Sequence, residues 1–201
     1  MVRDNRGQEM GKVWYSSDLH LDHKNIGRFR DYPEHILEQA NQLIESGKDT
    51  RPLGTIANEI WIKAEWHSAG ITDRDTVHLL GDNSFGRNGL LVLADLPGRK
   101  ISYGGNHDDL NITDYLMAFS DYRGCVKKPR VGWLSHFPLH PTELRGHFSI
   151  HGHVHYATIP DYRFVNVCCD NLYKETGSAF IEQSDLKELI DRRRESKKVE
   201  Y

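Results

Sequence analysis

The feature that most constrains this 201-residue chain is a repeated local order, in which a predicted strand is followed at once by side chains that can bind a metal ion. The predicted strands cover residues 12–17, 75–80, 99–103, 130–134 and 148–150. The side chains that follow them are Asp18 and His20, Asp82, Asn106 and His107, His136, and His153 and His155. Open α/β sheets bind ligands at the carboxyl ends of their strands. We therefore expect a fold that gathers these five segments at one edge.

The densest of these segments is His151-Gly152-His153-Val154-His155. In an extended chain, residues two apart point the same way, with a rise of about 3.3 Å per residue. His153 and His155 could therefore face one ion, and neutral imidazole is a common ligand of transition metals. Taken alone, the segment also fits solvated histidines on a turn, but the other four segments favour a metal site.

The remaining pattern indicates an α/β protein. Apolar residues at helical spacing predict helices over residues 33–46, 55–68 and 90–95, and a charged C-terminal helix over 184–197. Two further strands are expected over residues 123–127 and 163–168, the first pairing with 130–134 around Lys128-Pro129. No repeat or linker divides the chain, so we expect one domain over residues 1–201 with its core over about 12–170.

Composition narrows the functional classes. The formal net charge of −3 gives no strong case for binding long nucleic acids, and no run of about 20 apolar residues could cross a membrane. Residues 1–12 lack the apolar region of a signal peptide. The three cysteines form neither a disulfide framework nor a Cys-x-x-Cys zinc pattern, which is typical of reduced thiols. We therefore expect a cytoplasmic protein, in the host cytoplasm if a phage encodes it.

The donor types indicate the kind of metal centre. Oxygen and nitrogen ligands without thiolate suit Mn²⁺ first, and also Fe, Zn or Ni. The candidates are too many for one ion, whereas two ions sharing one carboxylate would use them all. A pair of ions about 3.5–4 Å apart can clamp the attacking and leaving oxygens of an in-line displacement. The sequence thus predicts two divalent ions and phosphoester hydrolysis.

The order of these motifs resembles the calcineurin-like metallophosphoesterase superfamily. Its pattern of Asp-x-His, Gly-Asp, Gly-Asn-His-Asp, a lone His and Gly-His-x-His is present here as Asp18-Leu19-His20, Gly81-Asp82, Gly105-Asn106-His107-Asp108, His136 and Gly152-His153-Val154-His155. The resemblance spans residues 12–170, and residues 17–26 are similar to the small stand-alone bacterial and phage members.

The resemblance implies a single metallophosphoesterase domain of two packed β-sheets flanked by helices, with its active site at the strand carboxyl ends. One ion would bind Asp18, His20 and His155, and the other Asn106, His136 and His153. Asp82 would bridge both ions. A hydroxide between the ions would attack in line while His107 assists the leaving group. The expected substrate is a small nucleotide-type phosphodiester, such as a cyclic nucleotide or a dinucleotide.

One motif departs from the family. Many members continue Gly-Asp-x-x-Asp-Arg, where the second Asp orients the catalytic histidine and the Arg holds phosphate. Here these positions are Phe85 and Gly86, with Arg87 one residue later. Asp108 and Asp109 are candidate replacements for the orienting Asp. The candidate substrate contacts are His23, Arg87 and Asp108.

Several alternatives stay open at this stage. A nuclease of the same superfamily would have the same motifs, and a phosphatase acting on monoesters would need the same ions. A non-catalytic metal-binding scaffold for a protein partner would bind metal without turnover. A mononuclear zinc hydrolase would use only some of the histidines, and leaves Asp82 and Asn106 unexplained. The substrate and the oligomeric state are not determined by the sequence.

Overall fold

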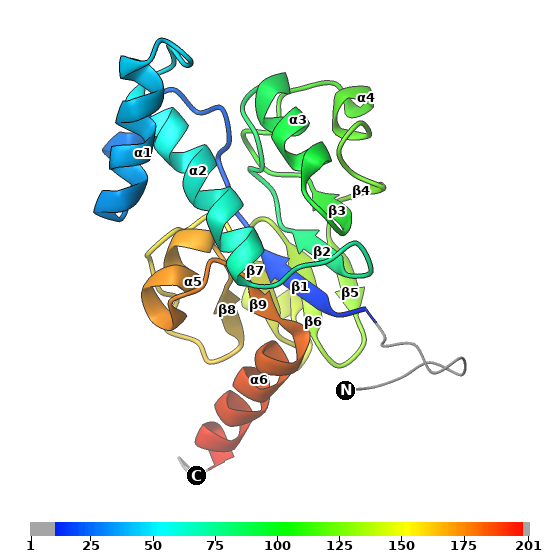
Figure 1. Cartoon of the computed structure of the whole chain (residues 1–201). Helices are drawn as coiled ribbons and strands as arrows, with labels where there is room; N and C mark the ends of the chain where they lie inside the picture. The colour runs from blue at the N-terminus through cyan, green and yellow to red at the C-terminus, as the bar shows by residue number, and fades with distance from the viewer. Residues whose placement is uncertain (1–10, 199–201) are drawn as a thin grey trace.

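The computed structural model describes residues 11–198 and contains two mixed β-sheets (Figure 1). The N-terminal segment used above to argue against a signal peptide lies almost wholly outside the described residues. The first sheet has the order β4-β3-β2-β1-β9. Its parallel strands are β1 (Val13–Ser16), β2 (Thr76–Leu79), β3 (Arg99–Tyr103) and β4 (Asp121–Arg123). The two-residue β9 (Ile181–Glu182) pairs antiparallel with β1.

The second sheet has the order β5-β6-β7-β8. Its strands are β5 (Val126–Lys128), β6 (Gly132–Ser135), β7 (Ser149–His151) and β8 (Phe164–Asn166). β6, β7 and β8 run parallel, whereas β5 and β6 form the antiparallel pair predicted around Lys128-Pro129. The prediction of that hairpin is confirmed, although each strand is shorter than expected.

Helices cover the sheets, as predicted. They are α1 (Glu34–Glu45), α2 (Leu53–Ser68), α3 (Arg87–Asp95), α4 (Ile112–Tyr115), α5 (Cys169–Thr176), α6 (Gln183–Lys198), and the short 3-10 helices η1 (Ile26–Arg28) and η2 (Pro141–Glu143). Pro33 and Pro52 directly precede α1 and α2, where a fixed φ and a missing N–H suit a helix start. α3 begins three residues earlier than predicted.

The first sheet separates two hydrophobic cores, because its side chains alternate between faces. Trp14 and Val77, which are paired in register, pack with the helices in one core. Tyr15 and Ile101 face the other core, which lies between the sheets. α5 and α6 complete that second core with Leu172, Leu186 and Ile190. The predicted α/β architecture of two packed sheets flanked by helices is therefore confirmed.

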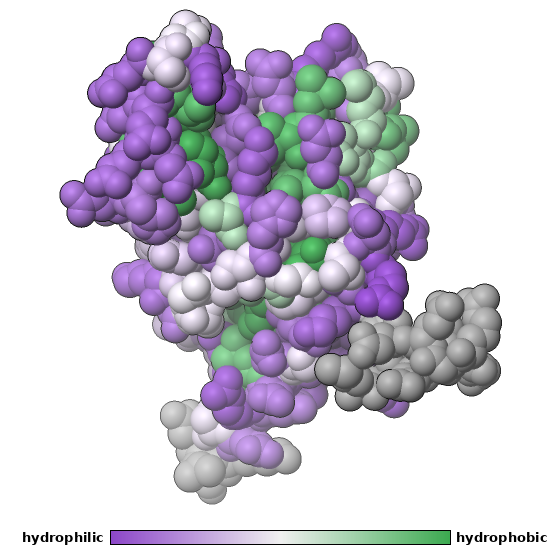
Figure 2. All heavy atoms as spheres, viewed as in Figure 1, coloured by the Kyte–Doolittle hydropathy of each residue, from purple (hydrophilic) through white to green (hydrophobic). Residues whose placement is uncertain are grey.

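The two sheets meet at the carboxyl ends of β1 and β8, where Ser17 and Cys168 form a parallel bridge. The five predicted metal-binding segments follow β1, β2, β3, β6 and β7, each of which has a parallel partner in its sheet. Hydrophilic residues cover most of the face shown in Figure 2, including the outer side of α1. Within residues 11–198, no helix combines the length and apolar character that a membrane crossing needs.

Candidate metal centre

The loops at the carboxyl edge have an unusual backbone. Eight non-glycine residues in the described chain have positive φ, and six of these lie in the loops that carry the predicted ligands: Asp18, His20, Asp22, Asp82, His153 and His155. Side chains other than glycine rarely adopt this conformation, and it clusters at functional sites. Hydrogen bonds to the neighbouring loop hold it, because the amides of Asp18 and His20 donate to the carbonyls of Gly81 and Asp82, each at 3.0 Å.

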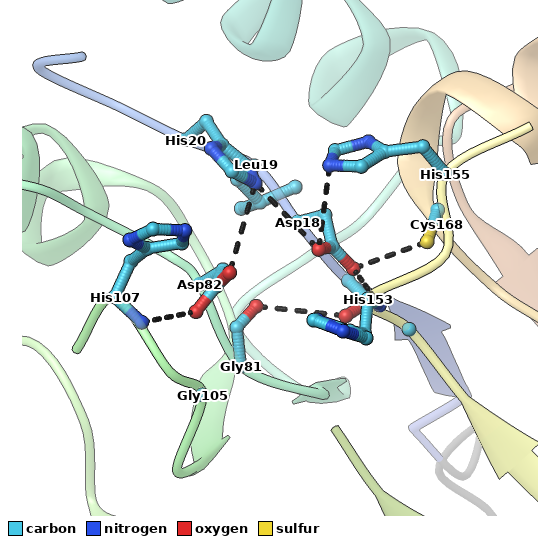
Figure 3. A network of polar contacts seen from close by, with 12 residues as sticks. Asp18, Leu19, His20, Gly81, Asp82, Gly105, His107, His153, His155 and Cys168 are labelled. Carbon is cyan, nitrogen blue, oxygen red and sulfur yellow. Dashed lines mark hydrogen bonds and ion pairs between the residues drawn. The ribbon is translucent and has the colours of Figure 1, made fainter. Parts of the chain in front are cut away.

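Asp18, His20 and Asp82 form the buried centre of the site (Figure 3). His20 Nε2 lies 3.6 Å from Asp18 Oδ1 and 3.9 Å from Asp82 Oδ2. Asp18 Oδ1 and His20 Nε2 are buried and have no hydrogen-bond partner. Two atoms that bind one ion at about 2.1 Å lie roughly 3–3.5 Å apart, close to the separation of Asp18 Oδ1 and His20 Nε2. The pair is therefore arranged as two ligands of one cation would be.

His155 completes this half of the site. Its Nε2 lies 3.9 Å from Asp18 Oδ1, and its Nδ1 lies 2.7 Å from Asp170 Oδ2. A carboxylate on the second nitrogen is the usual way in which a protein orients a metal-binding histidine. The ring of His155 is therefore fixed with Nε2 toward Asp18.

The other half is built around His136, which follows β6. His136 Nε2 lies 2.9 Å from Asn106 Oδ1 and 3.4 Å from Asp82 Oδ2. Its Nδ1 lies 2.8 Å from the carbonyl of Leu80, which fixes the ring. Asp82 Oδ2 therefore lies between His20 and His136, where a bridging carboxylate is expected.

His153 lies beside this second half. Its ring centroid is 5.1 Å from that of His136, and its side chain is exposed. Its amide donates to Asp18 Oδ2 at 2.9 Å. The Gly-His-x-His loop thus connects the two halves, with His155 on one side and His153 on the other (Figure 3).

The electrostatics fit a cation. Burial alone would raise the pKa of Asp18, but the nearby His20 and the charge of His136 hold that pKa well below its usual range. Burial lowers the pKa of His20. Asp18 and His20 therefore favour the carboxylate and the neutral imidazole that metal ligation requires.

His107 lies at the edge of this centre. Its amide donates to Asp82 Oδ1 at 2.9 Å, and its exposed ring stacks on Phe85 with centroids 4.9 Å apart and planes at 27°. The ring of His107 is 6.2 Å from that of His20. Phe85 stands at the sequence position of the orienting Asp in the family pattern. It supports His107 by stacking instead of by a hydrogen bond.

The three candidate substrate contacts have different surroundings. His23 lies in the wall of the site, with its ring 4.3 Å from Phe85 and 5.9 Å from His20. Arg87 begins α3, and its Nη2 lies 2.8 Å from Asp114 Oδ1 of α4 while its side chain is 72% exposed. The structure does not bring Arg87 into contact with the predicted ligands.

Asp108 holds two loops together. Its carboxylate accepts hydrogen bonds from the amides of Gly105, Asp82 and Asn83, and from the hydroxyl of Tyr115. These four bonds give Asp108 a structural role in place of the substrate contact, or the orientation of His107, expected from the sequence. Asp109 is exposed.

Sequence reasoning missed a buried network around Arg30. Its Nη2 donates to the carbonyl of Asp18 at 2.9 Å and to Asp170 Oδ2 at 3.3 Å, and its Nη1 donates to Asn58 Oδ1 at 2.7 Å. Arg30 thus links the first loop, α2 and α5. The residues are distant in sequence and belong to no short motif, so no local signal could have found them.

Cys168 was also missed as a neighbour of the centre. Its thiol donates to Asp18 Oδ2 at 3.1 Å, and Asp18, His155 and Cys168 have ligand-type atoms close together. Burial raises the pKa of this thiol well above its usual value. The thiol thus supports Asp18 Oδ2 by a hydrogen bond, while Asp18 Oδ1 faces the imidazoles.

Comparison with known proteins gives distant relatives. No family model matches the chain. It is 28% identical over 182 residues to the Gene 66 protein of Mycobacterium phage L5, covering 73% of this chain and 78% of that protein. The Gene 66 protein of Mycobacterium phage D29 is also 28% identical, over 184 residues, with 73% and 79% covered. The uncharacterized protein MJ1445 of Methanocaldococcus jannaschii is 24% identical over 162 residues, with 78% and 77% covered.

A solved structure shares the fold. The crystal structure of the protein of unknown function AQ665 from Aquifex aeolicus is similar with a TM-score of 0.60 and 22% identity, covering 90% of this chain and 100% of that one. At this identity the likeness shows the α/β fold alone.

Proposed function

We propose that this chain is a di-metal-dependent phosphodiesterase of the calcineurin-like metallophosphoesterase type. The observation that carries the proposal is the buried pair Asp18 Oδ1 and His20 Nε2, which face one another without hydrogen-bond partners beside Asp82. Leaving such atoms unpaired is costly in a folded protein. A cation between them would satisfy both.

The residues divide into two ligand sets. Asp18, His20 and His155 would hold one ion, and Asn106, His136 and His153 the other. Asp82, between His20 and His136, would be shared by both ions. Two divalent ions held in this way would supply Lewis-acid chemistry toward a phosphoester.

The chain's own residues would provide orientation and proton transfer. Asp170 and the carbonyl of Leu80 fix the rings of His155 and His136. His107, held by Phe85 but not among the proposed ligands, would donate a proton to the leaving oxygen. In the overall reaction, a water oxygen bonds to phosphorus, the bond from phosphorus to the leaving oxygen breaks, and that oxygen takes the proton.

The types of ligand atom also favour particular metal ions. The proposed ligands are oxygen and nitrogen atoms, and the nearby Cys168 thiol donates a hydrogen bond to Asp18 Oδ2. Mn²⁺ is our first choice, and Fe, Zn and Ni are compatible with the same donors. A mononuclear zinc site would use only one half of this arrangement, leaving His136 and Asn106 without a role.

The test is turnover of bis(4-nitrophenyl) phosphate beside 4-nitrophenyl phosphate, using metal-stripped protein with and without added Mn²⁺. We expect diester cleavage that requires the metal and is lost in Asp82→Ala. Asp95→Ala is a matched control, because Asp95 is exposed at the end of α3. No turnover of either ester by protein with bound metal would contradict the proposal and favour a scaffold.

A further inference from the structure

The described chain exposes aromatic rings next to the candidate centre. Its eight exposed large hydrophobic side chains are Phe29, Ile44, Leu91, Ile112, Leu116, Met117, Phe137 and Tyr156. The three aromatic members of this set are Phe29 (68% exposed), Phe137 (46%) and Tyr156 (44%). Phe29 contacts His23 in the wall of the site, Phe137 contacts His136 and His153, and Tyr156 directly follows His155. Exposed apolar side chains gathered at one place mark a binding surface more often than scattered ones do.

Phe29 lies on the His20 side of the centre. Its ring is 6.3 Å from that of His23, at an interplanar angle of 67°. The ring of His23 is in turn 5.9 Å from His20 and 4.3 Å from Phe85. A continuous set of rings therefore leads from a proposed metal ligand to an exposed aromatic face.

Phe137 lies on the His136 side. Its ring is 5.0 Å from that of His136 and 4.6 Å from that of His153, both proposed ligands of the second ion. Asp82 Oδ2 lies between the two sides, 3.9 Å from His20 Nε2 and 3.4 Å from His136 Nε2. A phosphate bound by ions on the two sides of Asp82 would therefore have one exposed aromatic ring on each flank.

We infer that the site takes a linear phosphodiester joining two nucleosides, with one base stacked on Phe29 and the other on Phe137. Every nucleobase has a π-face that stacks on aromatic side chains. A cyclic mononucleotide has one base and would use only one flank. This inference rests on the proposed function for the place of the phosphate, and goes beyond it in naming the substrate class.

Charge around Phe29 supports a short anionic ligand. Lys24 and Arg28 are exposed close to Phe29 in sequence, and Lys24 follows His23. Lys174 Nζ lies 5.6 Å over the ring of Tyr156, which follows His155. These few cations suit a dinucleotide with one phosphodiester, whereas a long nucleic acid needs many phosphate contacts.

The test is a fluorescence titration of Zn²⁺-loaded protein with two dinucleoside phosphorothioates, which resist hydrolysis and carry 2-aminopurine at the 5′ or the 3′ position. Phe29→Ala and Phe137→Ala should each weaken binding about fivefold or more, because a stacked base contributes that much. Each variant should also relieve the fluorescence quenching of only one of the two probes. Leu91→Ala is the control, since Leu91 is 51% exposed on α3, and its binding should match that of the wild type.

The outcomes separate this inference from the proposed function. Binding unaffected by either ring would overturn the inference, even if the protein hydrolyses diesters. Dependence on one ring alone would also overturn it, because it would indicate a ligand with a single base. Failure to hydrolyse any diester would overturn the proposed function, while the titration would still report whether two bases bind.

Discussion

At the scale of single residues, the candidate centre consists of side chains held in conformations that their residue types disfavour. Asp18, His20, Asp82, His153 and His155 all have positive φ. Each such residue costs of the order of 1–3 kcal/mol and persists only where its surroundings impose it. Here the amides of Asp18 and His20 are fixed by carbonyls of the adjacent loop. The fold therefore holds the proposed ligands in place through backbone contacts of its own.

The role proposed for His107 leads to a prediction at this scale. His107→Ala should keep the metal content of the wild type but lose most turnover of bis(4-nitrophenyl) phosphate, by about 10²–10⁴-fold. The reason is that His107 lies beside the proposed ligands without being one of them. Metal analysis and steady-state kinetics on the same samples would measure both effects.

The matched control is His67→Ala, since His67 is an exposed histidine on α2. It should change neither metal content nor rate. A fully active His107→Ala would show that proton donation comes from another group.

The residue scale also shows how far the sequence could lead. Short motifs were enough to indicate Asp18, His20, Asp82, Asn106 and His136, because each directly follows a strand, and the structure brings these side chains together. Arg30 and Asp170 could not be found in this way. They are 140 residues apart and meet only through the packing of the first loop against α5.

At the scale of elements, the centre depends on how closely the loop after β7 approaches the loop after β1. Gly152 lies at that contact, where a Cβ would stand 2.0 Å from Ser17 Oγ and 2.3 Å from Asp18 Oδ2. The absence of a side chain at Gly152 therefore lets the second sheet bring His153 and His155 to Asp18. The Gly-His-x-His motif carries its glycine for this steric reason.

Gly152→Ala should separate the two loops. We expect a loss of stability of about 1–3 kcal/mol together with much weaker metal binding, because Asp18 must move to admit the methyl group. Denaturant unfolding with and without Mn²⁺ would measure both. Gly124→Ala is the control, because a Cβ there meets nothing within 4 Å and the backbone is not in the left-handed region. Equal metal affinity in the two variants would contradict this account of the contact.

A buried polar cluster lies between the sheets, away from the centre. His78 of β2 has Nε2 2.6 Å from Lys128 Nζ of β5 and Nδ1 3.1 Å from the hydroxyl of Tyr103, and it stacks on Tyr15. Burial, together with the charge of Lys128, lowers the pKa of His78 to about 3. His78 is therefore neutral in the folded protein at any ordinary pH.

This predicts a pH dependence of stability with a definite sign. The unfolded chain binds a proton at this position below about pH 6.5, whereas the folded chain does not until about pH 3. The stability contributed by neutral His78 is thus complete above pH 6.5 and is lost as the pH falls toward 3. Between pH 7 and pH 5, the wild type should lose about 1–2 kcal/mol more free energy of unfolding than His78→Gln does.

Urea unfolding of chelator-treated protein at the two pH values would measure this difference. His67→Gln, an exposed site, should behave like the wild type. Equal losses in the wild type and His78→Gln would show that His78 does not carry this dependence.

The long helices were predicted, whereas several short elements were not. α1, α2 and α6 have periodic sequences of twelve residues or more, and the sequence predicted each within about two residues. α4, with four residues, and β9, with two, have no period to recognise. α5 begins with buried cysteine and polar residues, a pattern that is more typical of the end of a strand than of a helix. Short helices such as these depend on tertiary packing and not on propensity.

At the scale of the whole molecule, the centre joins the two sheets. Asp18, His20, Asp82 and Asn106 follow strands of the first sheet, whereas His136, His153 and His155 follow strands of the second. An ion bound by residues from both sheets stabilises the folded state in proportion to the logarithm of its concentration over its dissociation constant. The number of bound ions therefore indicates whether residues of the two sheets form one metal centre.

The most direct test of the central claim is the number of metal ions bound per chain after reconstitution with Mn²⁺ and removal of free metal, measured by inductively coupled plasma mass spectrometry. We predict about two ions in the wild type, because the shared carboxylate lies between two ligand sets. Asp82→Ala should hold markedly fewer, and Asp95→Ala should match the wild type. A wild-type value near one would indicate a mononuclear site, and a value near zero would contradict the metal centre altogether.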